Sequence, residues 1–404
     1  MAHVCFVSQR YYPGDARLYT EISSLQDAGY SVDVICMKGR DDSFTTLADG
    51  VRMYRIPAMT RRRASKVRYV AEYISFLVPT FFLLTLLHIV RGYRLVHVTN
   101  LPDGLLFSAL IPKLLGAKII FDVRECTPEM FMDRFGGGEG SKVIKVMTWI
   151  EQLCLRFADM TVTCTEPMRK ALISRGGDPN KIDVILNVSV VHTRRAPTLP
   201  DPEAPIDGHL RVVTHGSIIR RYGHDVLIDA MVHVTKELPD ARLEIMGDGP
   251  WVGDLKAQVK RLGLENVVTF AGFLPHNDLI DRLMSAHIGA VTLVKNPESD
   301  LVHTFKMYEY MQLGIPMVIS RTTGVASYFS DDTMAFFEPG NARDLADAII
   351  DLARDPNRRY RLAKNALQAY NEHSPARQKA EYLRIVRQVL RPEYSSVTSE
   401  VPRG

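Results

Sequence analysis

Residues 302–320, "VHTFKMYEYMQLGIPMVIS", predict a helix that leads directly into a buried strand. Thr304 stands at the N-cap position, where its side chain can accept a hydrogen bond from the first turn. Gly314 ends the helix, and the apolar segment that begins at Pro316 has the length and composition of a sheet strand. A helix that feeds a short apolar strand is the repeating unit of an α/β sheet, so this stretch sets the fold class.

The same alternation of short apolar runs and helical periodicity extends through the rest of the 404 residues. It predicts parallel strands with helices on both faces of each sheet. Residues 191–208, with four prolines and no apolar period, divide the strands into two sets. The predicted strands are 3–8, 31–37, 51–57, 95–99, 118–123, 159–164 and 181–187, then 210–216, 241–249, 267–273, 288–294, 316–320 and 334–340.

The predicted architecture is therefore two Rossmann-like doubly wound domains that face each other across a cleft. We expect an N-terminal domain over 1–190, a linker over 191–208 and a C-terminal domain over 209–372. A helix over 373–391 is expected to pack back towards the N-terminal domain, and the polar tail 392–404 is expected to be disordered.

Composition excludes several classes of function. A net charge of +4 is too small to indicate a nucleic-acid partner, and basic residues are not interleaved with aromatic ones. The five cysteines are scattered without CxxC spacing, which argues against a disulfide framework and a structural zinc site. The first residues lack the pattern of a signal peptide, so we expect a cytoplasmic protein.

One stretch raises the question of a membrane. The basic run "RRRASKVR" (61–68) precedes the largely apolar residues 69–90. Three interpretations stay open: a helix packed on a sheet, a helix lying on an anionic membrane surface, or a helix that spans the bilayer. Pro79 and the strand predicted directly after this stretch disfavour the span.

Lys306 and Glu309 lie near the start of the helix in the opening stretch, close to one face. Free amides at a helix N-terminus attract anions, and a lysine in the first turn strengthens that attraction. A carboxylate can accept two hydrogen bonds from a vicinal diol such as ribose. Two interpretations are equally supported: one nucleotide binds both side chains, or the two form a local ion pair.

Two other loops follow predicted strands, where ligands bind in doubly wound sheets. The loop 214–225 holds Gly216, Arg220 and Arg221, and the loop 245–250 holds two more glycines. Glycine allows a ligand to approach the backbone, and a guanidinium group can pair with phosphate oxygens. Taken alone, the arginines of the first loop are better explained as solvated side chains near a helix start, and the second loop as a tight turn between a strand and a helix.

In this order and spacing the loops resemble the retaining family 4 glycosyltransferases of GT-B fold, the glycosyl transferases group 1. The resemblance covers nearly the whole chain. It rests on the segments "VSQRYYPGDARLYTEISSLQDAGYSVDVIC", "ADMTVTCTEPMRKAL", "KIDVILN", "VTHGSIIRRYGHDVLIDA", "LPDARLEIMGDGP", "VTFAGFLPHNDL", "TFKMYEYMQLGIPMV" and "FFEPGNARDLADAI".

The resemblance implies metal-independent transfer of a sugar, with retention, from a nucleotide-sugar donor to an acceptor hydroxyl. The donor, a UDP- or GDP-sugar, belongs to the C-terminal domain and the acceptor to the N-terminal domain; no cofactor or metal site is implied. The implied catalytic residues are Arg221, Lys306 and Arg124. The implied donor-binding residues are Gly216, Arg220, Gly247, Gly249, Phe273, Thr304, Phe305 and Glu309, and the acceptor-binding residues are Asp15, Arg17, Asp122 and Glu125.

The chain departs from the family pattern in its C-terminal half. The family often carries two glutamates eight positions apart, and the partner position of Glu309 is Leu301, with Asp300 next to it but out of register. The usual Arg and Lys of the first loop fall on Ser217 and Tyr222, so their role passes to Arg220 or Arg221, of which we favour the second.

The N-terminal half departs as well. The glycine pair common in the first loop is replaced by "PGDARL", and the histidine often found after the fifth strand falls on Arg124. For Arg124 and its neighbours Asp122 and Glu125 the alternative is a polar network that braces the interdomain hinge.

The expected acceptor is a glycan or a lipid-linked intermediate of a surface polysaccharide, at the cytoplasmic face of the membrane. An anionic membrane surface is an expected partner through residues 61–90. Two alternatives stay open: a nucleotide-sugar epimerase of the same fold, and a catalytically idle nucleotide-sugar-binding partner subunit, suggested by Leu301.

Overall fold

The computed structural model describes residues 2–59, 66–135, 140–191, 193, 196–204, 206 and 208–390. The expected tail 392–404 and residues 61–65, which begin the basic run, lie outside the described residues. The chain forms two compact units. Unit 1 comprises the chain up to Leu186 together with the chain from Ala376, and unit 2 runs from Asn187 to Pro375.

Unit 1 is an eight-stranded sheet in the order β3-β4-β2-β1-β5-β6-β7-β8, parallel except for the β3–β4 pair. Its strands are β1 (His3–Val7), β2 (Ser31–Met37), β3 (Thr45–Ala48), β4 (Val51–Ile56), β5 (Leu95–Thr99), β6 (Lys118–Val123), β7 (Met160–Thr163) and β8 (Ile182–Val184). Its helices are α1 (Ala16–Asp27), α2 (Lys66–Arg91), η1 (Asp103–Ala109), α3 (Leu110–Leu114), α4 (Thr127–Phe135), α5 (Lys142–Phe157), α6 (Glu166–Ser174), η2 (Pro179–Lys181) and α14 (Pro375–Leu390).

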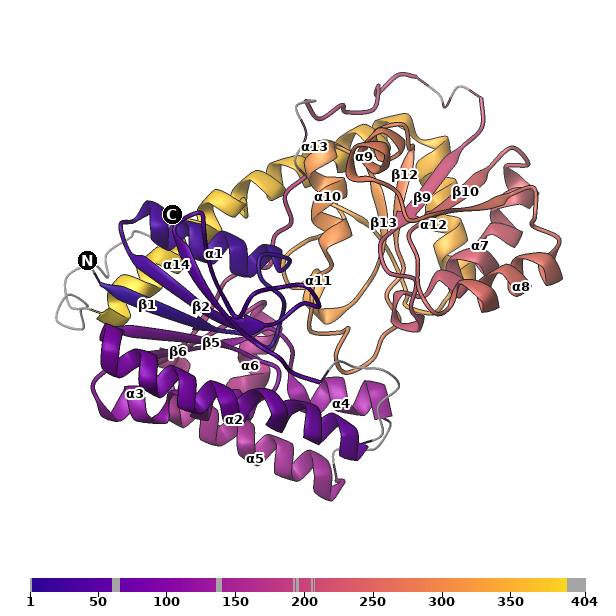
Figure 1. The fold of residues 1–404 in the computed structure, drawn as a ribbon. Coiled ribbons are helices and arrows are strands. Elements are labelled where there is room, and N and C mark those ends of the chain that lie inside the picture. The colour runs from indigo at the N-terminus through magenta and orange to yellow at the C-terminus, as the bar shows by residue number, and fades with distance from the viewer. Residues whose placement is uncertain are drawn as a thin grey trace. The chain divides into compact units, whose positions relative to one another are not determined.

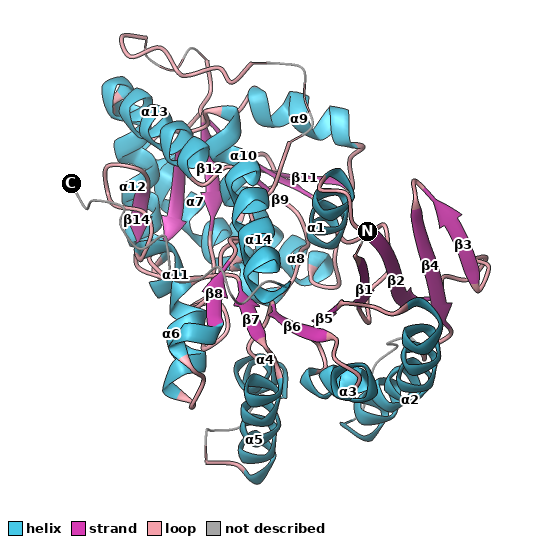
Figure 2. Cartoon of the chain, turned by 90° about the vertical axis from the view of Figure 1, so that its left-hand side faces the viewer, coloured by secondary structure: helices cyan, strands magenta, loops and turns pink. Residues whose placement is uncertain are grey.

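Helices cover both faces of this sheet. Helices α1 and α14 share a core with the strands on one face, and α2, α3 and α5 lie on the other (Figures 1 and 2). The aromatic ring of Tyr382 on α14 is buried there, and its hydroxyl lies 2.9 Å from Nδ1 of His97 on β5. The last described helix of the chain thus completes the core of the unit that begins it.

Unit 2 is a parallel six-stranded sheet in the order β11-β10-β9-β12-β13-β14. Its strands are β9 (Arg211–His215), β10 (Arg242–Met246), β11 (Val268–Gly272), β12 (Ile288–Val291), β13 (Met317–Ser320) and β14 (Ala335–Phe337). Its helices are η3 (Arg220–Tyr222), α7 (His224–Glu237), α8 (Val252–Leu262), α9 (His276–Met284), α10 (Phe305–Leu313), α11 (Thr323–Ala326), α12 (Ala342–Arg354) and α13 (Pro356–Glu372). Helices α7, α8 and α12 cover one face, and α9 and α10 cover the other.

The two doubly wound α/β sheets are as predicted, and every predicted strand is present within a few residues of its expected ends. One strand was missed. The hairpin partner β3 is short and mostly exposed, so it has neither an apolar run nor alternation to reveal it.

The apolar stretch 69–90 forms most of α2, a single helix that continues through Pro79. Phe76, Thr80 and Leu84 are fully buried along one stripe of this helix, so it packs on unit 1. By length and composition alone, residues 70–91 of α2 could also cross a membrane, with a mean hydropathy of 2.0, and only 28% of the apolar window is buried.

Candidate active site

The predicted anion site lies at the start of α10, beside the carboxyl end of β9. Thr304 occupies the N-cap position with extended backbone, but its side chain makes no capping hydrogen bond. Its hydroxyl is buried without a hydrogen-bond partner among the described residues. The first-turn amides of α10 are therefore not capped by Thr304, which suits an anionic ligand.

Lys306 is the cation of this site. Its side chain is 6% exposed, and Nζ lies 4.4 Å from the ring centroid of Tyr222. Burial lowers its pKa to about 8, although the charge of Glu309 partly opposes the shift. Burial and the charge of Lys306 also lower the pKa values of His215 and His224 to about 3, so both imidazoles are neutral at pH 7.

The ion pair between Lys306 and Glu309, which was the alternative to a bound nucleotide, is not formed. Within the described chain, no carboxylate lies within ion-pair distance of the Lys306 ammonium group. Glu309 instead accepts a hydrogen bond from Ser189 Oγ (2.8 Å), and its other oxygen lies 3.1 Å from His215 Nε2 without hydrogen-bond geometry. Burial raises the pKa of Glu309, and its neighbours fix the carboxylate in one orientation while leaving lone pairs for a diol.

The three glycines of the two loops that were predicted to bind the donor have different roles. Gly216 has a φ of +104°, and a Cβ there would meet nothing closer than the Lys306 side chain at 4.0 Å. A Cβ at Gly247 would lie 1.9 Å from the carbonyl oxygen of Gly216, and one at Gly249 would lie 2.2 Å from that of Ile218. Gly247 and Gly249 therefore let the two loops pack together, whereas Gly216 leaves open space in front of Lys306.

The two arginines of the first loop lie in η3 and have separate partners. Arg221 forms a 2.5 Å ion pair with the buried carboxylate of Glu298, which holds the pKa of Arg221 above its ordinary value despite the opposing effect of burial. The guanidinium group of Arg220 lies 5.3 Å from the ring centroid of Trp251. Arg221 is thus fixed near the site, with its charge partly matched.

Position 301 brings no carboxylate to the site. Asp300, its neighbour, accepts hydrogen bonds from the backbone amide and the hydroxyl of Thr323 at 2.8 and 2.7 Å, so it serves the start of α11. The acidic side chain beside the arginines is Glu298, which the sequence pattern did not single out. Nothing in the spacing could have identified it, because its pairing depends on the fold of the loop.

Two aromatic side chains border this edge of unit 2. Phe273, which follows β11, is 83% exposed, and Phe305, the first residue of α10, is 46% exposed. Exposed aromatic rings next to a ligand loop are suited to stacking on a base.

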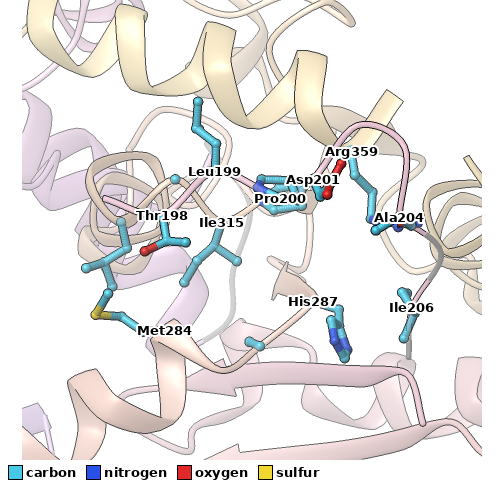
Figure 3. Close-up of a pocket in the computed structure, with 14 residues that line it drawn as sticks. Thr198, Leu199, Pro200, Asp201, Ala204, Ile206, Met284, His287, Ile315 and Arg359 are labelled. Atoms are coloured by element: carbon cyan, nitrogen blue, oxygen red, sulfur yellow. The ribbon is translucent and has the colours of Figure 1, made fainter. Parts of the chain in front are cut away.

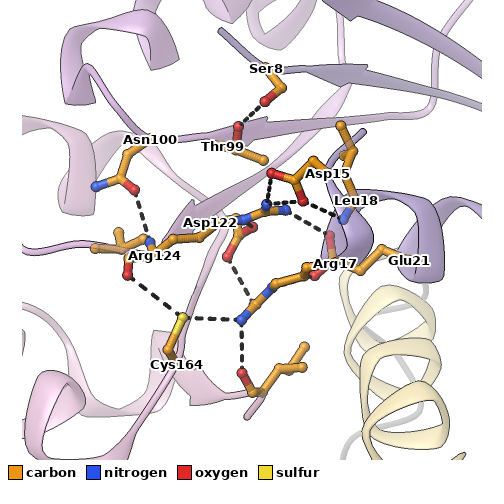
Figure 4. Close-up of polar contacts among 12 residues, drawn as sticks. Ser8, Asp15, Arg17, Leu18, Glu21, Thr99, Asn100, Asp122, Arg124 and Cys164 are labelled. Atoms are coloured by element: carbon orange, nitrogen blue, oxygen red, sulfur yellow. Dashed lines mark hydrogen bonds and ion pairs between the residues drawn. The ribbon is translucent and has the colours of Figure 1, made fainter. Parts of the chain in front are cut away.

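In unit 1, three of the predicted acceptor residues, Asp15, Arg17 and Asp122, meet Arg124 in one ionic network (Figure 4). Arg124 binds Asp122 at 2.5 Å and both carboxylate oxygens of Asp15 at 2.8 and 2.9 Å. Arg17 binds Glu21 at 2.9 Å and the other oxygen of Asp122 at 3.0 Å. Burial alone would raise the pKa of Asp122, but the two guanidinium groups hold it well below its ordinary value.

This network fixes Arg124 and Asp122 within unit 1. Both are buried, Asp122 completely. Glu125 differs, since its side chain is 29% exposed and pairs with Arg10 at 3.4 Å. The catalytic and acceptor roles assigned to these residues stay predictions.

Glu21, His97 and Asp122 also bring three potential metal ligands within 4.8 Å of one another. Arg17 and Arg124 already bind both carboxylates there. Two guanidinium groups next to the cluster disfavour a bound cation.

A cavity of about 200 Å³ lies at the amino ends of the unit 2 strands, opposite the end at which Lys306 lies (Figure 3). It lies between the linker near Leu199 and the segments that lead into β12 and β13, at His287 and Ile315. Arg359 on its wall donates hydrogen bonds to three backbone carbonyls. The cavity is at the amino ends of the strands, so it is separate from the Lys306 site.

Comparisons with known proteins cover both units. The family model "Glycosyl transferases group 1" matches residues 198–369, and "Glycosyl transferase 4-like domain" matches residues 16–188. Sulfoquinovosyl transferase SQD2 of Arabidopsis thaliana is 25% identical over 67% of this chain and 52% of its own length. A phosphatidylinositol N-acetylglucosaminyltransferase subunit of Homo sapiens is 22% identical over 83% of this chain and 66% of its own length. The chain spans about half the length of several curated relatives it matches.

Solved structures share the fold. Sucrose-phosphate synthase of Thermosynechococcus elongatus superposes with a TM-score of 0.72 at 16% identity, covering 97% of this chain and all of that one. HepE of Anabaena in complex with UDP gives a TM-score of 0.69 at 18% identity, covering 96% of this chain and 99% of that one. Two family models in sequence, over two doubly wound units, identify this chain as a member of the group 1 glycosyltransferases of GT-B fold, with a glycosyltransferase 4-like N-terminal domain.

Proposed function

We propose that the chain transfers a sugar from a nucleotide-sugar donor to an acceptor hydroxyl with retention of configuration and without a metal. The observation that carries the proposal is the buried Lys306, whose charge has no carboxylate partner among the described residues, at an uncapped helix start. A buried cation without an anion is unfavourable unless a ligand supplies one. Diphosphate fits, because it is doubly anionic and can accept hydrogen bonds from amides.

In the proposed reaction the bond between the sugar C1 and the β-phosphate oxygen breaks, and its electron pair stays with the diphosphate. Lys306 and the α10 amides stabilise that developing charge. The acceptor oxygen then bonds to C1 on the face that the phosphate leaves, and its proton passes to the departing diphosphate. Such a route needs no nucleophile from the protein and no metal.

The nucleoside is held at the other end of the site. Glu309, whose carboxylate is fixed by the hydrogen bond from Ser189, accepts hydrogen bonds from the ribose hydroxyls, and Phe273 stacks on the base. Gly216 leaves room for the phosphates in front of Lys306. Arg221, held by Glu298, adds positive charge beside them.

UDP- and GDP-sugars are the proposed donors, and no cofactor is required. HepE was solved with UDP and with UDP-glucose, and one relative is a GDP-mannose-dependent phosphatidylinositol monomannoside mannosyltransferase of Mycolicibacterium smegmatis. Relatives that act on phosphatidylinositol support a lipid-linked acceptor in polysaccharide or glycolipid assembly. We place the protein at the cytoplasmic face of a membrane, with residues 61–90 in contact with an anionic surface.

The test compares K306A and E309A with K256A, which removes an exposed lysine of the same unit. Thermal-shift screening of UDP-, GDP-, ADP- and TDP-sugars first identifies the donor, because a ligand stabilises the state that binds it. Loss of Lys306 should lower kcat/KM by about 10²–10³-fold, as for other groups that stabilise transition-state charge. Loss of Glu309 should weaken donor binding by about 10–100-fold, since a hydrogen bond to a charged group contributes about 1.5–3 kcal/mol. Unchanged turnover in both variants would refute the site.

The epimerase alternative is separated by omitting the acceptor. An epimerase releases sugar from the nucleotide without an acceptor, whereas the proposed transferase requires one. A partner protein that only binds the nucleotide would show the thermal shift without turnover over a panel of acceptors.

A further inference from the structure

Helix α2 exposes an uncharged apolar stripe. Along the side opposite its buried stripe, the large apolar side chains are between 47 and 74% exposed. They are Val70, Ile74, Val78, Phe82, Leu86, Ile89 and Val90. Glu72 and His88, the acidic and basic side chains between Val70 and Val90, are both buried against unit 1. The exposed stripe therefore offers lipid or protein a surface free of charge.

Two neighbouring helices continue this surface. Both α2 and α5 pack against η1, and η1 runs into α3, so the three helices form one layer beneath the sheet (Figures 1 and 2). Leu110 and Leu114 are exposed on α3, as is Leu115 directly after it, and α5 exposes Val143, Val146 and Trp149. With α2 they account for thirteen of the 21 large apolar side chains exposed in the described chain. Such a concentration marks an interaction surface, because isolated exposed apolar residues are ordinarily scattered.

Among the described side chains, the exposed charges on this layer are of one sign. Lys142 and Lys145 are exposed on α5 among its apolar side chains, and the sequence 61–68, which runs into the start of α2, reads "RRRASKVR". The two carboxylates carried by α2, α3 and α5, those of Glu72 and Glu151, are buried. A surface that combines apolar side chains, tryptophan and lysine is suited to the head-group region of an anionic bilayer.

From this arrangement we infer that α2, α3 and α5 together form a docking face for an anionic membrane, and that α2 lies on the bilayer without crossing it. A spanning α2 would have to leave unit 1, exposing the sheet beneath Phe76 and Leu84 and taking Glu72 into hydrocarbon. The inference extends the proposed membrane contact of 61–90 to α5, and it rests on that contact and not on the proposed sugar transfer.

The test is co-sedimentation of the full chain with vesicles of phosphatidylcholine, with and without phosphatidylglycerol, in the absence of donor. V146S/W149S should weaken binding by about tenfold, because it removes two apolar anchors from α5. K142E/K145E should weaken binding to the phosphatidylglycerol vesicles selectively, and most strongly at low salt. Circular dichroism and thermal melting check that both variants fold, as expected for exposed positions.

Matched controls lie elsewhere on unit 1. L47S removes an apolar side chain that is 64% exposed on β3, and K170E/K181E makes the same charge change outside the three helices. Both should bind vesicles like the parent protein. Equal binding by the parent and the α5 variants would overturn the docking face.

A second measurement locates α5 directly. In a W251F background Trp149 is the only tryptophan, so brominated lipids report its depth through quenching. Quenching by lipids brominated near the head group supports the inference. Absence of quenching on bound protein would overturn it. It would also be overturned if the parent protein forms a dimer, the V146S/W149S variant is a monomer, and neither binds vesicles.

Discussion

Replacing Lys306 by methionine should stabilise unit 2 while it weakens donor binding. Burial lowers the pKa of Lys306 from 10.5 to about 8, so the unfolded chain binds this proton more tightly than the folded one. Each tenfold change in proton affinity corresponds to about 1.4 kcal/mol, which gives a destabilisation of about 3 kcal/mol by the charged lysine. Loss of the contact with Tyr222 offsets about 0.5–2 kcal/mol of this. The expected net gain for K306M at pH 7 is therefore about 1–3 kcal/mol.

The gain must depend on pH with a defined sign. The folded-state pKa of Lys306 is lowered, so the destabilisation is fully present below about pH 8 and disappears as the pH rises towards 10.5. The advantage of K306M should therefore be largest at neutral pH and small near pH 10.5. Urea unfolding in a W149F background follows Trp251, which lies in the same unit.

K256M is the matched control. Lys256 is an exposed lysine of unit 2 that also lies over an aromatic ring, that of Phe270, at 5.8 Å. It should change stability little and without pH dependence. A K306M protein that is less stable than the parent at pH 7, or whose gain is the same at pH 7 and 10.5, would show that Lys306 is not under electrostatic strain.

Three further predictions concern the loops and the buried network. G247A should lower the unfolding free energy by about 2–4 kcal/mol in thermal melting, since its Cβ would overlap the carbonyl of Gly216. D122N should cost about 3–5 kcal/mol at pH 7, because it removes the buried carboxylate that Arg17 and Arg124 share. Its deficit should shrink as the pH falls below the ordinary pKa of 3.8, where the stability that the lowered pKa provides is lost. D300A should cost about 1 kcal/mol through lost bonds to Thr323 and leave transfer rates unchanged; a hundredfold loss of transfer would instead assign Asp300 the sugar-binding role.

The fold was predictable because its signals are local. Glycine at 314, with a φ of +74°, ends α10 where the sequence placed the end, and the strand that follows is fully buried, as its composition indicated. The edge strand β3 was not predicted because almost none of its side chains is buried. Local patterns predict elements whose side chains face a core.

The site was predictable in part. The lysine and glutamate of α10 stand out at a helix start, but the partners of that glutamate, Ser189 and His215, come from two other segments of unit 2. Likewise no local signal in the sequence reveals that Asp15 pairs with Arg124 across 109 positions. Pairings between distant segments depend on packing, which periodicity does not encode.

Helix α14 has a consequence for the order in which the protein assembles during synthesis. Its side chains Tyr382, Ile385 and Val386 close the core formed by β1, β2 and α1, which are translated before unit 2. All of unit 2 is translated between them, as one uninterrupted segment. Unit 2 can therefore reach its native state on the growing chain, whereas unit 1 must wait, with an apolar face uncovered, until α14 has been made.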